Sequence, residues 1–166
     1  PFPIQSEGKA NHNMSVPFGE HKMELSELEN VYQYKHEQEK IILNDPMKVF
    51  EQTKDLRNWI KEGFVVFYLN TDLSVISREI ISIGTLNSCI IHPREIFRTA
   101  IARNSNSIIV AHNHPAGNTD PSTEDLKIKT QIKKAGEILQ IPLLDHVIVS
   151  KQGYNSIKDN KENFPL

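Results

Sequence analysis

The sequence predicts an α/β domain in which a mixed β-sheet is flanked by helices. Apolar runs of strand length occur at 64–69, 75–81, 107–111 and 143–149. Segments with the apolar spacing of a helix precede or separate them, at about 46–60, 94–103 and 123–140. The chain has 166 residues, of which 38% are hydrophobic, so it has the length of one domain and can bury a substantial core.

Local sequence signals mark where these elements begin and end. Pro46 and Pro93 each open a predicted helix, because proline is favoured at the first helical position. The turn-forming residues 70–72 join the first two strands into a hairpin. Pro115 lacks an amide donor and therefore ends the third strand.

Three segments are expected along the chain. Residues 1–22 are polar and begin with Pro1, so we expect a disordered extension or sequence added for expression, with Met14 as a possible natural start. Residues 23–45 have weak periodicity and are expected to form an N-terminal arm with one strand. Residues 46–166 carry the predicted domain.

A candidate metal site follows the third strand, in the segment His112–Asp125. His112 and His114 are two residues apart, and such residues project to the same side of an extended chain, whereas Asn113 points to the other side. Asp125 falls in the first turn of the next predicted helix. Three ligands of this kind leave one tetrahedral position for water, which is typical of catalytic zinc.

Ser122 and Asp125 also have a simpler interpretation. Ser122 can cap the helix, with Asp125 at the third helical position of a capping box, although Asp is shorter than the Glu or Gln which that motif prefers. The two roles of Asp125 do not exclude each other. For the histidines, the simpler interpretation is a pair of surface side chains at the end of a strand.

The motif as a whole resembles a known family. His112-x-His114, seven residues, Ser122, two residues and Asp125 reproduce the JAMM (MPN-plus) metalloprotease motif. The surrounding segments HNHPAG, DPSTED and AGEILQIPLLDHVIV resemble the RadC-like branch of that family, over about residues 46 to 157.

The resemblance implies a JAB/MPN fold, akin to that of cytidine deaminases, and a zinc-dependent hydrolase of peptide or isopeptide bonds. It implies one zinc ion per chain held by His112, His114 and Asp125. It places Glu62 as the general acid and base and Ser122 as a donor to the developing oxyanion. From the residues alone, Glu62 is one of 21 acidic residues, and only the resemblance selects it.

Two departures from the RadC-like pattern stand out. Ala116 occupies a position that is usually Ser, but this position is not a ligand. The helix-hairpin-helix module of longer RadC proteins is not readable in this sequence, so the nucleic-acid functions attributed to that module are not expected.

Two other functions are weighed against the metalloprotease. A zinc deaminase would use similar chemistry, but its H-x-E and P-C-x-x-C signature is absent. A non-catalytic module associated with DNA repair, or one that binds protein, is the alternative from another class, and the intact ligand set argues against it. Asp145 and His146 form a second polar pair that could orient a ligand imidazole, although such pairs at the end of a strand are usually structural.

The composition limits which binding partners and which cellular location are expected. The net charge is −2, and the basic cluster Lys127, Lys129, Lys133 and Lys134 lies on a predicted helix where it is expected to be solvated, so specific nucleic-acid binding is not expected. An unidentified protein or peptide substrate is expected instead. The single Cys89 suits a reducing cytoplasm. No apolar run approaches the roughly 20 residues that span a bilayer, so no membrane partner is expected.

Overall fold

The computed structural model describes residues 40–84 and 91–158. In chain order, its elements are α2 (Pro46–Glu51), the 3-10 helix η1 (Leu56–Asn58), β1 (Gly63–Leu69), β2 (Val75–Ile83), α3 (Pro93–Ala102), β3 (Ser107–Asn113), α4 (Thr123–Leu139), β4 (Leu143–Val149) and β5 (Tyr154–Ser156). None of the helices in these two ranges is long and apolar enough to cross a membrane.

The five strands form one mixed sheet in the order β2-β1-β3-β4-β5. β1 is antiparallel to both β2 and β3, β3 is parallel to β4, and β5 is antiparallel to β4. The predicted α/β class and the predicted hairpin of β1 and β2 are therefore confirmed. β3 is the central strand, and every one of its residues is buried.

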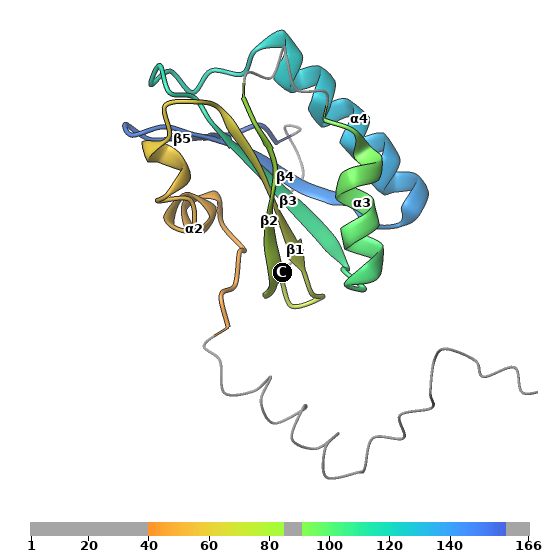
Figure 1. Cartoon of the computed structure of the whole chain (residues 1–166). Helices are drawn as coiled ribbons and strands as arrows, with labels where there is room; N and C mark the ends of the chain where they lie inside the picture. Colours follow the sequence, from red (N-terminus) through yellow and green to blue (C-terminus); the bar gives the residue numbers. More distant parts are fainter. Residues whose placement is uncertain (1–39, 85–90, 159–166) are drawn as a thin grey trace, which may run out of the picture. The chain divides into compact units, whose positions relative to one another are not determined.

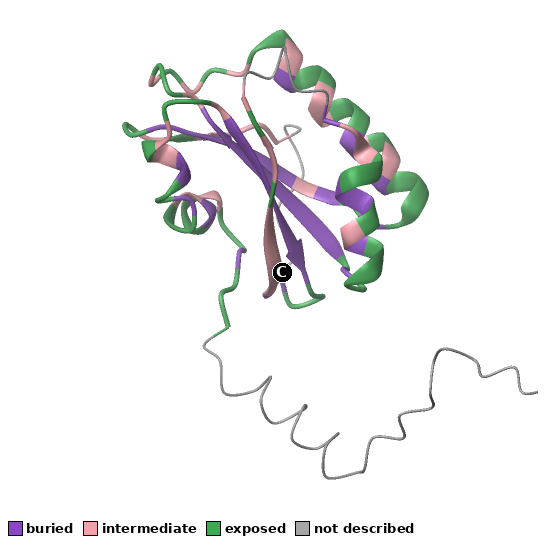
Figure 2. Ribbon diagram, in the orientation of Figure 1, coloured by how far each residue is buried: buried purple, intermediate pink, exposed green. Residues whose placement is uncertain are grey.

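Helices cover both faces of the sheet (Figure 1). Alternate side chains of β1 and β3 pack against α3 and α4 on one face, in the core cluster that contains Phe64, Val110 and Ile132. The intervening side chains pack against α2 and η1, in a second cluster that contains Val65 and Ala111. Figure 2 shows the result as a buried sheet between helices whose outer surfaces are exposed. Because both faces are covered, β1 and β3 are buried along their whole length rather than at alternate positions.

The first helix differs from the prediction, which continued it to about residue 60. α2 ends at Glu51, and η1 follows as a separate turn. Thr53 is buried, and its hydroxyl donates to the carbonyl of Phe50 at 3.0 Å, which satisfies a carbonyl at the end of α2. Two short segments bring both Val49 and Leu56 into the same core cluster.

β3 and β5 also differ from the prediction. β3 continues past Ala111 to Asn113, so it includes His112, and it ends before Pro115. β5 was not predicted, since three residues without marked alternation give no strand signal. At the N-terminal side, Leu43 is buried against the sheet, and its amide donates to the carbonyl of Leu73 at 3.0 Å. The predicted segments 1–22 and 23–45 lie almost wholly outside the described residues, and their boundaries remain predictions.

Candidate metal centre and its cavity

The two candidate histidine ligands lie at the end of the central strand. His112 is the penultimate residue of β3 and is completely buried, whereas the side chain of His114 is 15% exposed. The amide of His114 donates to the carbonyl of Val149 at 2.9 Å, which continues the pairing with β4 beyond the end of β3. The chain therefore remains extended, and the Nε2 atoms of His112 and His114 lie 2.9 Å apart.

Asp125 meets the two histidines from the first turn of α4. Its Oδ1 lies 3.1 Å from Nε2 of His112, and its Oδ2 lies 3.5 Å from Nε2 of His114. The candidate ligand atoms of the three residues all lie within 4.8 Å of one another. The structure thus brings together the three residues that the sequence motif predicted.

Ser122 and Asp125 also form the capping box that was the simpler interpretation of the sequence. The hydroxyl of Ser122 accepts from the amide of Asp125 at 3.1 Å, and Oδ2 of Asp125 accepts from the amide of Ser122 at 2.8 Å. The Ser122 hydroxyl also lies 2.7 Å from this Oδ2, to which it can donate. The cap uses Oδ2, whereas Oδ1 is buried without a hydrogen bond. Asp125 can therefore cap α4 with one oxygen and bind a metal ion with the other.

The remaining ring nitrogens have partners that orient the imidazoles. Nδ1 of His114 lies 2.8 Å from the carbonyl oxygen of Asn118. A carbonyl only accepts, so this nitrogen carries the proton, and Nε2 of the neutral ring keeps a lone pair for a metal ion. Nδ1 of His112 lies 2.7 Å from Nε2 of His146, a buried residue of β4.

Burial and close contact shift the pKa values in this cluster. The carboxylate of Asp125, whose Oδ2 lies 3.5 Å from Nε2 of His114, raises the pKa of His114 above its ordinary value of 6.5. Burial alone would raise the pKa of Asp125, but the close approach of the His112 and His114 rings outweighs it and holds that pKa far below its ordinary value of 3.8. Burial lowers the pKa of His146 well below 6.5, so this ring is neutral.

This donor set suits a divalent metal ion. Oδ1 of Asp125 is buried without a hydrogen bond, and Nε2 of His112 and Nε2 of His114 face each other beside it. A buried carboxylate oxygen without a donor is costly in the absence of a cation. A cation in contact with all three atoms removes that cost. Nitrogen and oxygen ligands of this type are used by zinc and by other transition metals.

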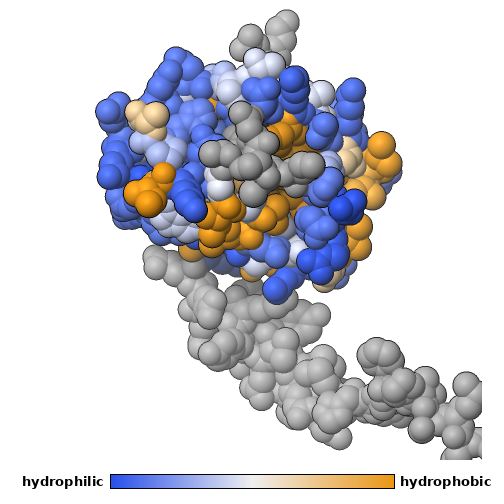
Figure 3. All heavy atoms as spheres, turned by 45° about the horizontal axis from the view of Figure 1, so that its top comes forward, coloured by the Kyte–Doolittle hydropathy of each residue, from blue (hydrophilic) through white to orange (hydrophobic). Residues whose placement is uncertain are grey.

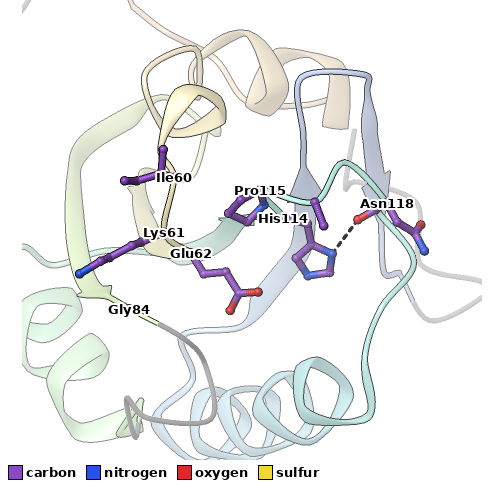
Figure 4. Close-up of a pocket in the computed structure, with 8 residues that line it drawn as sticks. Ile60, Lys61, Glu62, Gly84, His114, Pro115 and Asn118 are labelled. Atoms are coloured by element: carbon purple, nitrogen blue, oxygen red, sulfur yellow. Dashed lines mark hydrogen bonds between the residues drawn. The ribbon is translucent and has the colours of Figure 1, made fainter.

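A cavity of about 580 Å³ opens beside His114 (Figure 4). It is lined by residues from the end of η1 to β1, the end of β2 and the segment after β3: Ile60, Lys61, Glu62, Gly84, His114, Pro115, Ala116 and Asn118. Glu62 is half-buried, and Figure 4 shows its carboxylate pointing across the cavity toward the ring of His114. The structure therefore places Glu62 and His114 on the wall of the same cavity.

Apolar surface accompanies this cavity. Ile60 lines it and is 90% exposed, and Ile83, which precedes Gly84, is 56% exposed. Figure 3 shows apolar residues gathered near the middle of a largely hydrophilic face. The cavity therefore has exposed apolar side chains in its wall and beside it.

Asn113 fixes the backbone on both sides of Glu62. The prediction that its side chain points away from the histidines is confirmed, because its Oδ1 accepts from the amide of Gly63 at 2.6 Å. Its Nδ2 donates to the carbonyls of Lys61 at 3.1 Å and Trp59 at 3.4 Å. A side chain at Gly63 would lie 2.5 Å from the ring of Trp59, so only glycine fits there. Sequence reasoning did not find this role of Asn113.

A comparison with protein families identifies the chain. The model of the RadC-like JAB domain matches residues 42–162. This chain belongs to the RadC-like JAB domain family. The observed mixed sheet with flanking helices is a JAB/MPN-type fold, as the resemblance implied.

Curated relatives of the domain carry the name UPF0758 protein. One from Chlorobium chlorochromatii is 52% identical over 99 residues, which are 60% of this chain and 45% of that protein. One from Thermotoga maritima is 42% identical over 120 residues, which are 72% of this chain and 54% of that protein. The chain thus spans about half the length of the curated relatives it matches, and their names assign no activity.

The other polar residues named in the sequence analysis are not among the candidate ligands or lie outside the described residues. Asp145 is buried, and its carboxylate accepts from the Ser156 hydroxyl at 2.8 Å, while burial raises its pKa. Lys127 forms an exposed ion pair with Glu124 at 3.5 Å, in keeping with a solvated face of α4. Cys89 lies outside the described residues.

Proposed function

We propose that this RadC-like JAB domain is a zinc-dependent hydrolase that cleaves peptide or isopeptide bonds. The observation that carries the proposal is the convergence of His112, His114 and Asp125 on one point beside a cavity that also contains Glu62. Three ligands from a rigid strand and a helix terminus leave room for a fourth at the cavity. That arrangement is typical of catalytic rather than structural metal sites.

Zinc is the metal we propose, because two imidazole nitrogens and one carboxylate oxygen are ligands that it commonly takes at about 2.0–2.2 Å. When bound, zinc supplies Lewis-acid chemistry that lowers the pKa of water and polarises a carbonyl group. The hydrogen bond from Nδ1 of His114 to Asn118 keeps Nε2 of that ring aimed at the site.

Glu62 is the proposed general acid and base. Its carboxylate is half-buried on the wall of the cavity, where it can accept a proton from the attacking water and return that proton to the leaving amine. Its backbone is held by the hydrogen bonds of Asn113 to both neighbours and by the bond from the Gly84 amide to its own carbonyl at 2.8 Å. A carboxylate on such a fixed segment meets the positional demand of proton transfer.

Ser122 is the proposed donor to the oxyanion of the scissile carbonyl. Its hydroxyl lies 2.7 Å from Oδ2 of Asp125, so donation to substrate requires the hydroxyl to turn away from that oxygen. The serine would still cap α4 through its lone pair, which accepts from the amide of Asp125. Capping and oxyanion donation are thus compatible in one residue.

A trapping experiment tests the proposed activity. A zinc-loaded Glu62→Gln chain is used as bait, captured proteins are identified by mass spectrometry, and they are then incubated with the zinc-loaded wild-type chain. Cleavage of a captured protein at one bond is the expected result. A His112→Ala chain is the control for capture that does not need the metal. Captured proteins that remain intact would contradict a hydrolase and favour a binding module.

The proposed substrate is a protein or peptide, and we propose a reducing compartment such as the cytoplasm, in keeping with a single cysteine. Specific DNA binding is not part of the proposal, because the net charge is −2 and nucleic-acid binders carry a strong basic surface. Sequence-specific binding of DNA at nanomolar concentration in physiological salt would contradict this view.

A further inference from the structure

His146 is a buried histidine that contacts the candidate ligand His112. It lies in β4, which is parallel to β3, and its Nε2 lies 2.7 Å from Nδ1 of His112. Phe64 packs on both rings, parallel to His112 with a centroid distance of 6.2 Å and edge-on to His146 at 5.7 Å. The two imidazoles are therefore fixed relative to each other.

Only one proton can occupy the short contact between these rings. If Nε2 of His146 carried it, Nδ1 of His112 would be the acceptor, and the neutral His112 ring would have its own proton on Nε2. That nitrogen lies 3.1 Å from Oδ1 of Asp125, so the proton would occupy the place of the metal ion. If Nδ1 of His112 carries the proton instead, Nε2 keeps its lone pair and can bind metal.

We infer that His146 is a positioning residue, whose Nε2 accepts the proton of His112 Nδ1 and so leaves His112 Nε2 free to bind the metal ion. This inference rests on the proposed metal site. The acceptor is a fully buried imidazole, so it adds no negative charge behind the ligand, unlike the carboxylates that often hold ligand histidines. The second ring nitrogen, Nδ1 of His146, is buried without a hydrogen bond, which is the cost of this arrangement.

Two substitutions separate positioning from packing. His146→Leu fills similar space without an acceptor, whereas His146→Gln keeps an oxygen near the place of Nε2. Val147→Ala is the matched control, because Val147 is the next buried residue of β4 and faces the opposite core cluster. Zinc affinity is measured by competition with a chelator, and Tm is measured for each metal-free chain.

We expect His146→Leu to weaken zinc binding roughly 10- to 100-fold, His146→Gln to restore it to within a few-fold of wild type, and Val147→Ala to lower Tm without changing zinc affinity. Equal zinc affinity in wild type and His146→Leu would overturn the inference and leave the proposed function standing. A wild-type chain that binds no zinc would overturn both.

If His146→Leu does not fold, nitrogen NMR of the zinc-loaded wild-type chain decides. The inference requires His146 to carry its proton on Nδ1 and to have a bare Nε2. A proton on Nε2 of His146 in the zinc-loaded chain would overturn it.

Discussion

Oδ1 of Asn113 lies 2.6 Å from the backbone nitrogen of Gly63, so the residue between the two candidate ligand histidines holds the residue that follows Glu62. Asn113 and Gly63 belong to neighbouring strands, β3 and β1, and are 50 positions apart in the sequence. The end of β3 and the residue after it therefore present the two candidate ligands on one side. On the other side, Asn113 fixes the segment that carries the proposed acid and base.

Asn113→Ala should disturb the position of Glu62 without disturbing metal binding. It leaves the amide of Gly63 and the carbonyl of Lys61 without their side-chain partner, and the loss at the buried Gly63 amide typically costs about 1–3 kcal/mol. We expect a lower Tm, nearly unchanged zinc affinity in the folded chain and a reduced kcat. Asn113→Asp keeps the acceptor but loses the donor and should fall between the two. A full kcat in Asn113→Ala would show that Glu62 does not depend on this clamp.

Glu62→Gln separates chemistry from metal binding. The substitution preserves size and removes a proton acceptor, so zinc content and Tm should stay near those of wild type, while hydrolysis falls by at least the roughly 10²- to 10⁴-fold typical of acid–base catalysis. Asp125→Asn should lose zinc instead, because Asp125 supplies the candidate ligand oxygen. Loss of zinc in Glu62→Gln would make Glu62 a ligand, and full activity would place the base elsewhere.

Ser122→Ala tests the two roles of the serine. It removes the cap of α4 and the partner of Asp125 Oδ2, and loss of such a cap costs about 0.5–2 kcal/mol. Ser122→Thr keeps the hydroxyl and should keep both stability and activity. If Ser122→Ala lowers Tm but leaves kcat unchanged with a cleavable substrate, the serine only caps the helix.

The pKa shifts of Asp125 and His114 predict how stability depends on pH. The pKa of Asp125 is lowered in the folded chain, so its contribution is present above 3.8 and is lost as the pH falls further. The pKa of His114 is raised, so its contribution is complete below 6.5 and is lost as the pH rises through the raised value. Without metal, both contributions are present together between 3.8 and 6.5.

Zinc reverses the upper part of this dependence, because it binds the neutral imidazole and competes with the proton. We expect the difference in Tm between zinc-loaded and chelator-treated chain to grow as the pH is raised from about 5.5 to about 7.5. Thermal unfolding across this range measures it. A difference that shrinks toward higher pH would contradict the assignment of His114 as a ligand.

The parts of the site that the sequence predicted are those set by local geometry. His112 and His114 follow from the alternation of an extended strand, and Asp125 from the first turn of a helix. The contact of His146 with His112 depends on the parallel register of β3 and β4, which local sequence does not determine. The role of Asn113 depends in the same way on the register of β1 and β3. Glu62 was selected by family resemblance, since its approach to His114 requires the folded sheet.

The elements of the fold that the sequence predicted are likewise those with a local signal. Long apolar runs and proline or turn residues predicted four strands, the hairpin and three helices, the first of which was extended too far, because each has a local signal. The break between α2 and η1 was missed because Val49 and Leu56 fit one helical stripe, yet they reach the core from two separate turns. β5 is too short to be recognised, and it exists because it pairs with Val147–Val149 of β4.

The central claim is that His112, His114 and Asp125 together bind one metal ion. Its most direct test is a zinc titration of the purified, metal-stripped chain beside His112→Ala, His114→Ala and Asp125→Asn, with zinc content measured by elemental analysis after dialysis. We expect one zinc ion per wild-type chain and none retained in any of the three variants, each of which should still show the far-ultraviolet spectrum of a folded α/β domain. A wild-type chain that binds no zinc, or folded variants that retain it, would contradict the claim.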